Sequence, residues 1–151
     1  ADISAGKLSF DNDTFSVALF NETIEHLVGS PLPAVREMAR VLAPGGKLII
    51  TTPNAASLKN RLRLLAGLNV FTPLEVAINV APYKCHNREY TLAEVAELVR
   101  RAGFEPSRAT RHNIGEPKAT AAARAARAAY YAATWLWPPG RSLICVTAVK
   151  K

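Results

Sequence analysis

The sequence predicts an α/β fold with a mostly parallel β-sheet that helices cover on both faces. Residues 15–52 predict a strand, a helix and a second strand, with short links between them. Both strands are uninterrupted apolar runs, which is typical of parallel strands that are buried on both sides. The chain has 151 residues, of which 49% are hydrophobic and 21% charged. This composition is ordinary for a globular protein, so we expect one domain over residues 1–151.

The first predicted strand is the apolar run Phe15–Phe20, which follows a polar turn. A helix begins near Pro31, because proline is favoured in the first turn of a helix. Its apolar face is formed by residues at helical spacing, Val35, Met38, Ala39 and Leu42. Pro44-Gly45-Gly46 ends this helix, and Lys47–Thr52 forms the next strand.

A long connection follows the second strand. Residues 55–66 predict a helix with leucines on one side, and residues 67–87 are irregular because prolines interrupt them. A connection of this length inside a compact domain is usually functional or mobile.

The remaining elements complete the sheet. Thr91 and Glu94 predict a capping box that opens another helix. Two strands are predicted at Phe104–Arg111 and Leu143–Val149. Between them, the alanine-rich segment Pro117–Trp137 predicts a helix that packs its aromatic side chains on the sheet and leaves its arginines in solvent. The alternative is a basic helix that lies in a membrane interface.

The most informative pattern lies between residues 10 and 54. Glu25-His26-Leu27 follows the first strand, and Leu42-Ala43-Pro44-Gly45-Gly46 precedes the second. With these motifs in this order, the chain resembles the class I, Rossmann-like methyltransferases that depend on S-adenosylmethionine (SAM). Arg100-Arg101-Ala102-Gly103-Phe104 also resembles a helix end of that family. The resemblance covers nearly the whole chain and implies a last strand that is antiparallel and inserted between its neighbours.

The chain departs from the family at its N-terminal side. The glycine-rich loop after the family's first strand, and the acidic residue after its second, have no counterpart. The resemblance therefore implies a C-terminal portion, a partial Rossmann-like three-layer sandwich whose N-terminal strands are missing. Asp2 and Ile3 would match the loop at the adenine ring, and Phe20, Asn21 and Glu22 the sulfonium end of SAM. We expect the full-length protein to bind SAM and the fragment alone to be inactive.

Methyl transfer proceeds by in-line attack on a sulfonium methyl group, which requires alignment and desolvation of two reactants. A weakly acidic nucleophile also requires a base or a metal ion. His26 is the candidate catalytic base. The alternative is that His26 only caps or packs at the start of the following helix.

Glu22, Glu25 and His26 form the pattern E-x-x-E-H, and His86 offers a second imidazole downstream. Residues three and four apart share a helix face, so Glu22 can lie beside the other two. Carboxylates with an imidazole are ligands for Mg²⁺ or Mn²⁺. The pattern resembles metal-dependent 2′-O-methyltransferases of RNA 3′ ends and quinone-pathway O-methyltransferases. Many family members with Glu-His at this position are metal-free, so the metal site is a hypothesis.

The segment 55–87 resembles the substrate lids of the family, with Arg61, Tyr83 and His86 as candidate substrate contacts. The alternative is a surface elaboration without ligand contact. The leading prediction is a methyltransferase for a small-molecule, glycan or lipid-linked acceptor. The alternatives are an RNA 3′-terminal 2′-O-methyltransferase and a non-catalytic α/β interaction module.

Composition adds few constraints on partners. The net charge of +7 is spread along the chain, so RNA is a lesser option as a partner. The sequence contains no run of about 18 apolar residues, so it does not predict a membrane span. Two distant cysteines predict free thiols in a reducing cytoplasm. The chain opens at Ala1 in mid-pattern, so we expect a truncated domain, and its oligomeric state stays open.

Overall fold

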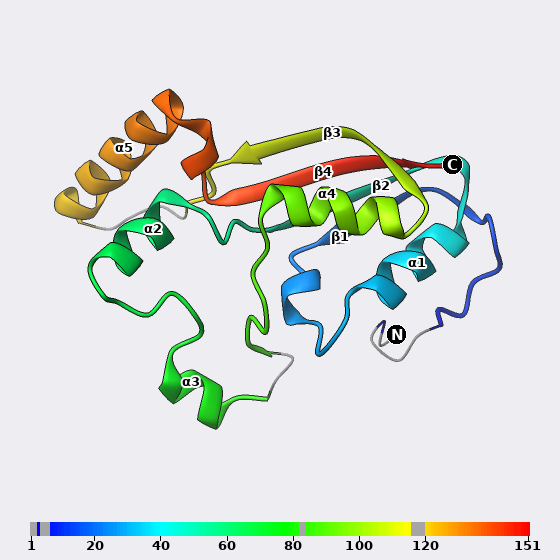
Figure 1. The fold of residues 1–151 in the computed structure, drawn as a ribbon, viewed down its shortest axis with the longest axis horizontal. Coiled ribbons are helices and arrows are strands. Elements are labelled where there is room, and N and C mark those ends of the chain that lie inside the picture. The colour runs from blue at the N-terminus through cyan, green and yellow to red at the C-terminus, as the bar shows by residue number, and fades with distance from the viewer. Residues whose placement is uncertain (1–2, 4–6, 82–83, 116–119) are drawn as a thin grey trace.

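The computed structural model describes residues 3, 7–81, 84–115 and 120–151. Its centre is a four-stranded sheet in the order β1-β2-β4-β3 (Figure 1). The strands are β1 (Phe15–Asn21), β2 (Leu42–Pro53), β3 (Phe104–His112) and β4 (Leu143–Lys150). β1 pairs with β2 in parallel, whereas β4 is antiparallel to both β2 and β3. Three strands therefore share one direction and the last strand is inserted against them, which confirms the predicted fold class.

Helices α1 (Leu32–Val41) and α4 (Leu92–Arg101) lie across one face of the sheet (Figure 1). The core between these layers is formed by the inward side chains of the strands and helices, among them Val35, Leu48, Ile50, Val95, Val99, Phe104, Ile144 and Val146. On the opposite face of β1, Val17 and Leu19 are 52% and 64% exposed. The capping box of α4 is present, since Thr91 and Glu94 bond to each other's backbone amides.

The link between α1 and β2 differs from the predicted turn. Pro44-Gly45-Gly46 lies inside β2, which already begins at Leu42. Phe15 pairs with Leu42 and Val17 with Lys47, so β2 carries a bulge between these two pairs. Gly45 has a φ of +75°, a conformation that glycine adopts without steric cost.

The connection after β2 holds two short helices, α2 (Leu58–Leu65) and α3 (Leu74–Asn79). The second lies in the segment predicted to be irregular. Ser57 accepts a hydrogen bond from the Asn60 amide and so caps α2. Neither helix has a buried side chain. The two helices therefore lie on the outside of the domain and add nothing to its core.

Helix α5 (Ala121–Leu136) extends beyond the end of the sheet (Figure 1). The prediction that its aromatic residues pack on the sheet is wrong for Trp135, which is 73% exposed. The inward positions of the helix are taken by Tyr130, whose hydroxyl donates to the Gly140 carbonyl, and by the buried Thr134. Trp135 follows Thr134 directly and so points to another side of the helix. Within the described residues, no helix is long and apolar enough to cross a membrane.

Candidate active site at the carboxyl edge of the parallel strands

The candidate site follows from the way the chain leaves β1. Asn21 ends the strand, and the Glu22 amide donates to the Thr51 carbonyl at 2.9 Å. The backbone then turns at Glu22, whose φ is +46°, into the short 3₁₀-helix η2 (Ile24–His26). The fully buried Ile24 anchors this turn in the core. The carboxyl ends of parallel strands are where open α/β sheets bind ligands, so Glu25 and His26 lie at the expected rim.

Glu25 is a carboxylate with no exposed surface. Its Oε2 accepts a hydrogen bond of 2.9 Å from the Thr52 hydroxyl of β2. Among the described residues, its Oε1 is the one buried side-chain polar atom without a hydrogen-bond partner. Burial raises the pKa of the Glu25 carboxyl above its ordinary value, an effect that outweighs the hydrogen bonds. An unpartnered buried carboxylate oxygen is costly, and a bound cation or donor would satisfy it.

His26 is fixed by a backbone carbonyl. Its Nδ1 lies 3.0 Å from the carbonyl oxygen of Cys85. Because a carbonyl only accepts, Nδ1 carries the proton, and Nε2 of the neutral ring keeps its lone pair. The Asn87 side-chain amide donates to the His26 carbonyl at 2.9 Å, which ties η2 to the loop before α4.

His86 comes from that same loop. Its Nδ1 lies 3.4 Å from Oε1 of Glu89, and the Asn60 side-chain amide of α2 donates to the other oxygen of Glu89 at 3.1 Å. The His26 and His86 rings meet edge to face at a centroid distance of 4.9 Å. The loop is drawn to η2 by backbone amides, since Asn87 donates to the Glu25 carbonyl at 2.7 Å.

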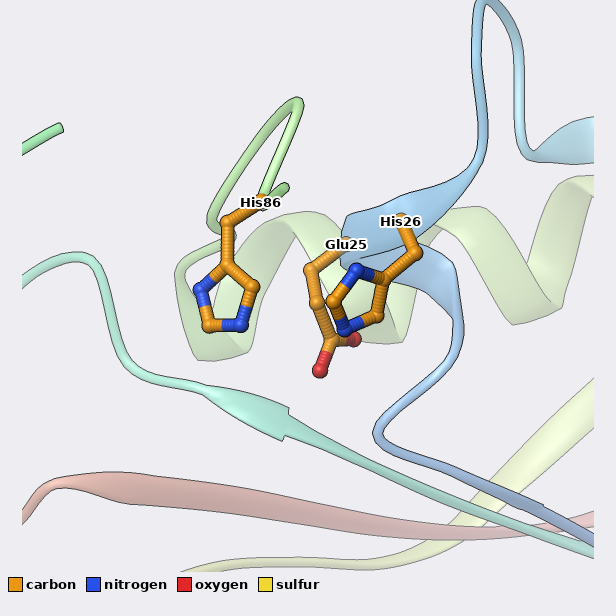
Figure 2. A group of neighbouring side chains, drawn as sticks. All are labelled: Glu25, His26 and His86. Carbon is orange, nitrogen blue, oxygen red and sulfur yellow. The ribbon is translucent and has the colours of Figure 1, made fainter. Parts of the chain in front are cut away.

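The Glu25 carboxylate and the two imidazole rings therefore form one group (Figure 2). One ligand atom from each of the three side chains lies within 4.8 Å of the others. In metal sites a ligating imidazole usually donates its other N–H to a carbonyl or carboxylate. His26 does so to Cys85, and His86 to Glu89. The sequence reasoning missed Thr52, Cys85 and Glu89, which orient the group, because their contacts arise only in the folded chain.

Glu22 is not part of this group in the described structure. The expectation that Glu22 shares a helix face with Glu25 and His26 is wrong, because the helix begins only at Ile24. Its side chain is exposed at the rim instead. Three of the four predicted metal ligands are therefore close together, and the fourth lies outside the group.

The family model described as methyltransferase domain matches residues 3–108, more than half of the chain. The chain belongs to this methyltransferase family. No curated protein matches the sequence.

Solved structures share the fold of this methyltransferase domain. A SAM-dependent methyltransferase of Thermotoga maritima has a TM-score of 0.60 at 21% identity, covering 95% of this chain and 59% of its own. The 1,6-didemethyltoxoflavin-N1-methyltransferase of Burkholderia thailandensis, solved with S-adenosylhomocysteine and 1,6-didemethyltoxoflavin bound, has a TM-score of 0.56 at 17% identity and covers 100% and 49%. The cyclase SpnF has a TM-score of 0.57 at 20% identity and covers 99% and 54%. The chain thus spans between 49% and 59% of the length of these structures. A cyclase with the same fold illustrates that the fold alone does not fix the reaction.

The residues predicted at the cofactor of the methyltransferase occupy different environments. Phe20 is 5% exposed and packs in the core, so only its backbone faces the rim. Asn21 and Glu22 have exposed side chains at the end of β1. Ile3 packs against the core from the N-terminal segment. Asp2 lies outside the described residues.

Two of the three predicted substrate contacts, Arg61 and His86, lie in the described part of the chain. The Arg61 guanidinium of α2 lies 5.2 Å from the centre of the Trp137 ring. Tyr83 lies outside the described residues. His86 borders a cavity of about 290 Å³ between the loop that precedes α4 and the segment that leads into α3, lined also by Phe71, Val76, Lys84, Arg88 and Glu89. This cavity mixes apolar and charged walls, and it adjoins the carboxylate–imidazole group through His86.

Proposed function

We propose that the full-length protein transfers the methyl group of SAM to a small-molecule, glycan or lipid-linked acceptor. The family match supports the reaction class. The observation that carries the proposal is the buried Glu25 beside two oriented imidazoles, at the edge where β1 and β2 end. A purely structural rim would not need an unpartnered carboxylate oxygen in its core.

SAM would supply an electrophilic methyl group on its sulfonium. Asn21 and Glu22 are the residues of this chain that we assign to it, because their side chains are exposed where β1 ends. Phe20 would act through its backbone, and Ile3 and Asp2 would line the adenine side. The turn at Glu22 is fixed by the bond from its amide to Thr51, so the rim is held in place before a ligand arrives.

His26 would accept the proton of the acceptor. The Cys85 carbonyl keeps the proton of the ring on Nδ1, which leaves Nε2 as the basic atom. The segment 55–87 would act as a substrate lid, because Phe71 and Val76 of this segment line the cavity beside His86. Removal of water by such a lid strengthens the electrostatic interactions of Glu25 and His26 with the reacting groups.

A divalent cation also fits the group formed by Glu25, His26 and His86, as an alternative to the base role of His26, because Nε2 of His26 cannot ligate an ion and accept a proton at once. The donor set is one carboxylate and two imidazoles, which matches Mn²⁺ better than Mg²⁺, since Mg²⁺ prefers oxygen ligands. Such an ion would lower the pKa of an acceptor hydroxyl. We assign Glu22 to the cofactor rather than to the metal, because its side chain is outside this group.

A ribose hydroxyl of RNA is the second acceptor class. This acceptor is favoured by the group of Glu25, His26 and His86, which is suited to activating a hydroxyl, and by the net charge of +7. RNA binding that weakens steeply with added salt would support this reading over a small-molecule acceptor. The third reading, a non-catalytic module, requires that the full-length protein does not bind SAM.

Isothermal calorimetry with S-adenosylhomocysteine tests the proposal on the full-length protein. We expect saturable binding that Glu22→Ala weakens by roughly tenfold, the cost of one lost charge-assisted hydrogen bond. Glu105→Ala is the matched control and should bind normally, because Glu105 is exposed at the start of β3, at the opposite edge of the sheet. Absence of binding by the unmodified full-length protein would reject SAM-dependent transfer and favour the non-catalytic module.

A further inference from the structure

The lid of the proposed site carries an unusual amount of exposed apolar surface. We call the exposed apolar side chains of α2, of α3 and of the loop between them the lid surface. They are Leu62, Leu64, Leu65, Leu68, Phe71, Leu74, Val76 and Ile78. Leu65 and Phe71 are 85% and 80% exposed. A concentration of exposed apolar side chains of this kind is typical of sites that bind another protein or a membrane.

The end of α5 extends this surface. Trp135 and Leu136 are 73% and 77% exposed. The neighbouring Trp137 contacts α2, since the Arg61 guanidinium lies 5.2 Å from the centre of its ring. Figure 1 shows α2, α3 and α5 at the same end of the molecule, away from both termini. Trp137 therefore lies beside the lid surface, whereas Trp135 lies at the end of β3, where it lines a hollow with His112 and Arg141.

The charge of this end of the molecule is one-sided. Residues 55–74 and 120–142 contain six of the chain's 19 Lys and Arg residues, namely Lys59, Arg61, Arg63, Arg124, Arg127 and Arg141. They contain none of its 12 Asp and Glu residues. Helix α3, which also belongs to the lid surface, adds one acidic residue, Glu75. With α3 included, this end of the molecule carries +5 of the net charge of +7, so the charge is less evenly spread along the chain than expected from the sequence. Apolar side chains interspersed with cations are complementary to an anionic surface that has an apolar interior.

We propose that the lid surface and the end of α5 bind the surface of an anionic lipid bilayer. The leucines and Phe71 would enter the boundary between headgroups and acyl chains, and Trp135 would lie at headgroup level, where tryptophan is enriched. Lys59, Arg61 and Arg63 would face the lipid phosphates. An acidic protein surface would match the positive charge, but it would offer no apolar region to the highly exposed leucines of the lid surface. The proposal goes beyond the proposed function, since bilayer binding requires neither cofactor nor acceptor.

Co-sedimentation with vesicles of phosphatidylcholine, with and without phosphatidylglycerol, tests the proposal on the full-length protein in the absence of SAM. We expect binding only to the anionic vesicles. The binding should fall steeply from 0.1 M to 1 M NaCl, because the Debye length shortens from about 10 Å to about 3 Å. Lys59→Gln/Arg63→Gln should weaken binding by roughly thirtyfold. Arg100→Gln/Arg101→Gln, two exposed arginines of α4, should leave it unchanged.

The apolar contribution is tested with Leu65→Ser/Phe71→Ser, which should abolish sedimentation with anionic vesicles. Val17→Ser/Leu19→Ser is the matched control, because these side chains are also exposed but lie on β1. Tryptophan emission gives a readout without any variant, since Trp135 and Trp137 are the two tryptophans of the chain. It should shift to the blue when anionic vesicles are added.

No sedimentation of the unmodified protein with anionic vesicles, or no shift of its emission, would overturn the proposal. Equal binding by the Leu65/Phe71 variant would overturn it as well. Capture of RNA at the same basic end, with no vesicle binding, would assign the surface to nucleic acid instead. Because vesicle binding is measured without cofactor, its failure is distinct from a failure to bind S-adenosylhomocysteine.

Discussion

The hydrogen bond between Thr52 and Glu25 allows a direct test of the buried site by a double-mutant cycle. The Thr52 hydroxyl donates to Oε2 of Glu25 at 2.9 Å, and both residues have no exposed surface. Oε1 of Glu25 has no partner among the described residues. Thr52→Val therefore leaves a buried carboxyl group with neither oxygen bonded, which should lower the free energy of unfolding by about 1–3 kcal/mol.

Glu25→Met should have a smaller effect. It removes the unpartnered oxygen, which is favourable, but leaves the Thr52 hydroxyl buried without an acceptor, which costs about 1–2 kcal/mol. The double variant Glu25→Met/Thr52→Val removes both polar groups and should be as stable as the unmodified protein or more so. The coupling between the two sites should thus be about 1–3 kcal/mol.

Urea unfolding in a buffer with a metal chelator measures these free energies of unfolding. An unchanged m-value, the slope of the free energy against urea concentration, shows that the variants remain compact. If the two single effects add within about 0.5 kcal/mol in the double variant, the hydrogen bond and the buried carboxylate are not as described. A double variant that is less stable than Thr52→Val would contradict the reasoning in the same way.

Three further predictions concern the elements that position the site. Arg40 donates to both carboxylate oxygens of Glu37, and the Leu8 amide donates to one of them. The hydrogen bonds from Arg40 are the main cause that lowers the pKa of the Glu37 carboxyl below its ordinary value of 4.5. The contribution of the ionised Glu37 to the stability of the fold is therefore complete above pH 4.5 and is lost as the pH falls through the lowered pKa. Thermal unfolding from neutral to acidic pH should accordingly vary less with pH for Glu37→Gln. Thr91→Ala removes the capping box of α4 and should cost about 1 kcal/mol in urea unfolding. Gly46→Ala would place a Cβ 2.7 Å from the Ala43 carbonyl oxygen and should lower the stability by about 1–3 kcal/mol, whereas an unchanged midpoint would argue against the bulge in β2.

The sheet was predictable because its strands are continuous apolar runs. Phe15–Phe20 and Lys47–Thr52 fall inside β1 and β2, and hydrophobic periodicity located α1 and α4. The bulge in β2 was not predictable, since Pro44-Gly45-Gly46 is equally typical of a helix end and of an irregular strand. The environment of Trp135 depends on where α5 lies relative to the sheet, which local patterns do not determine.

The site was predictable in its residue types but not in its geometry. The position of Glu25 and His26 after an apolar strand placed them at the rim of the sheet. Their meeting with His86 depends on backbone amides of residues 87 and 88 that donate to the Glu25 carbonyl, and backbone contacts leave no mark in the sequence. The separation of Glu22 from the group follows from its positive φ, which a residue other than glycine rarely shows.

Titration of the full-length protein with Mn²⁺, followed by the electron paramagnetic resonance signal of the free ion, tests the central claim most directly. The proposed group of Glu25, His26 and His86 predicts saturable binding at one site per chain, which Glu25→Gln and His86→Gln each abolish. His112→Gln, which alters the one histidine outside the group, should bind Mn²⁺ as the unmodified protein does. No binding by the unmodified protein, or binding that persists in the Glu25 and His86 variants, would contradict the assignment of this group as the metal centre of the site.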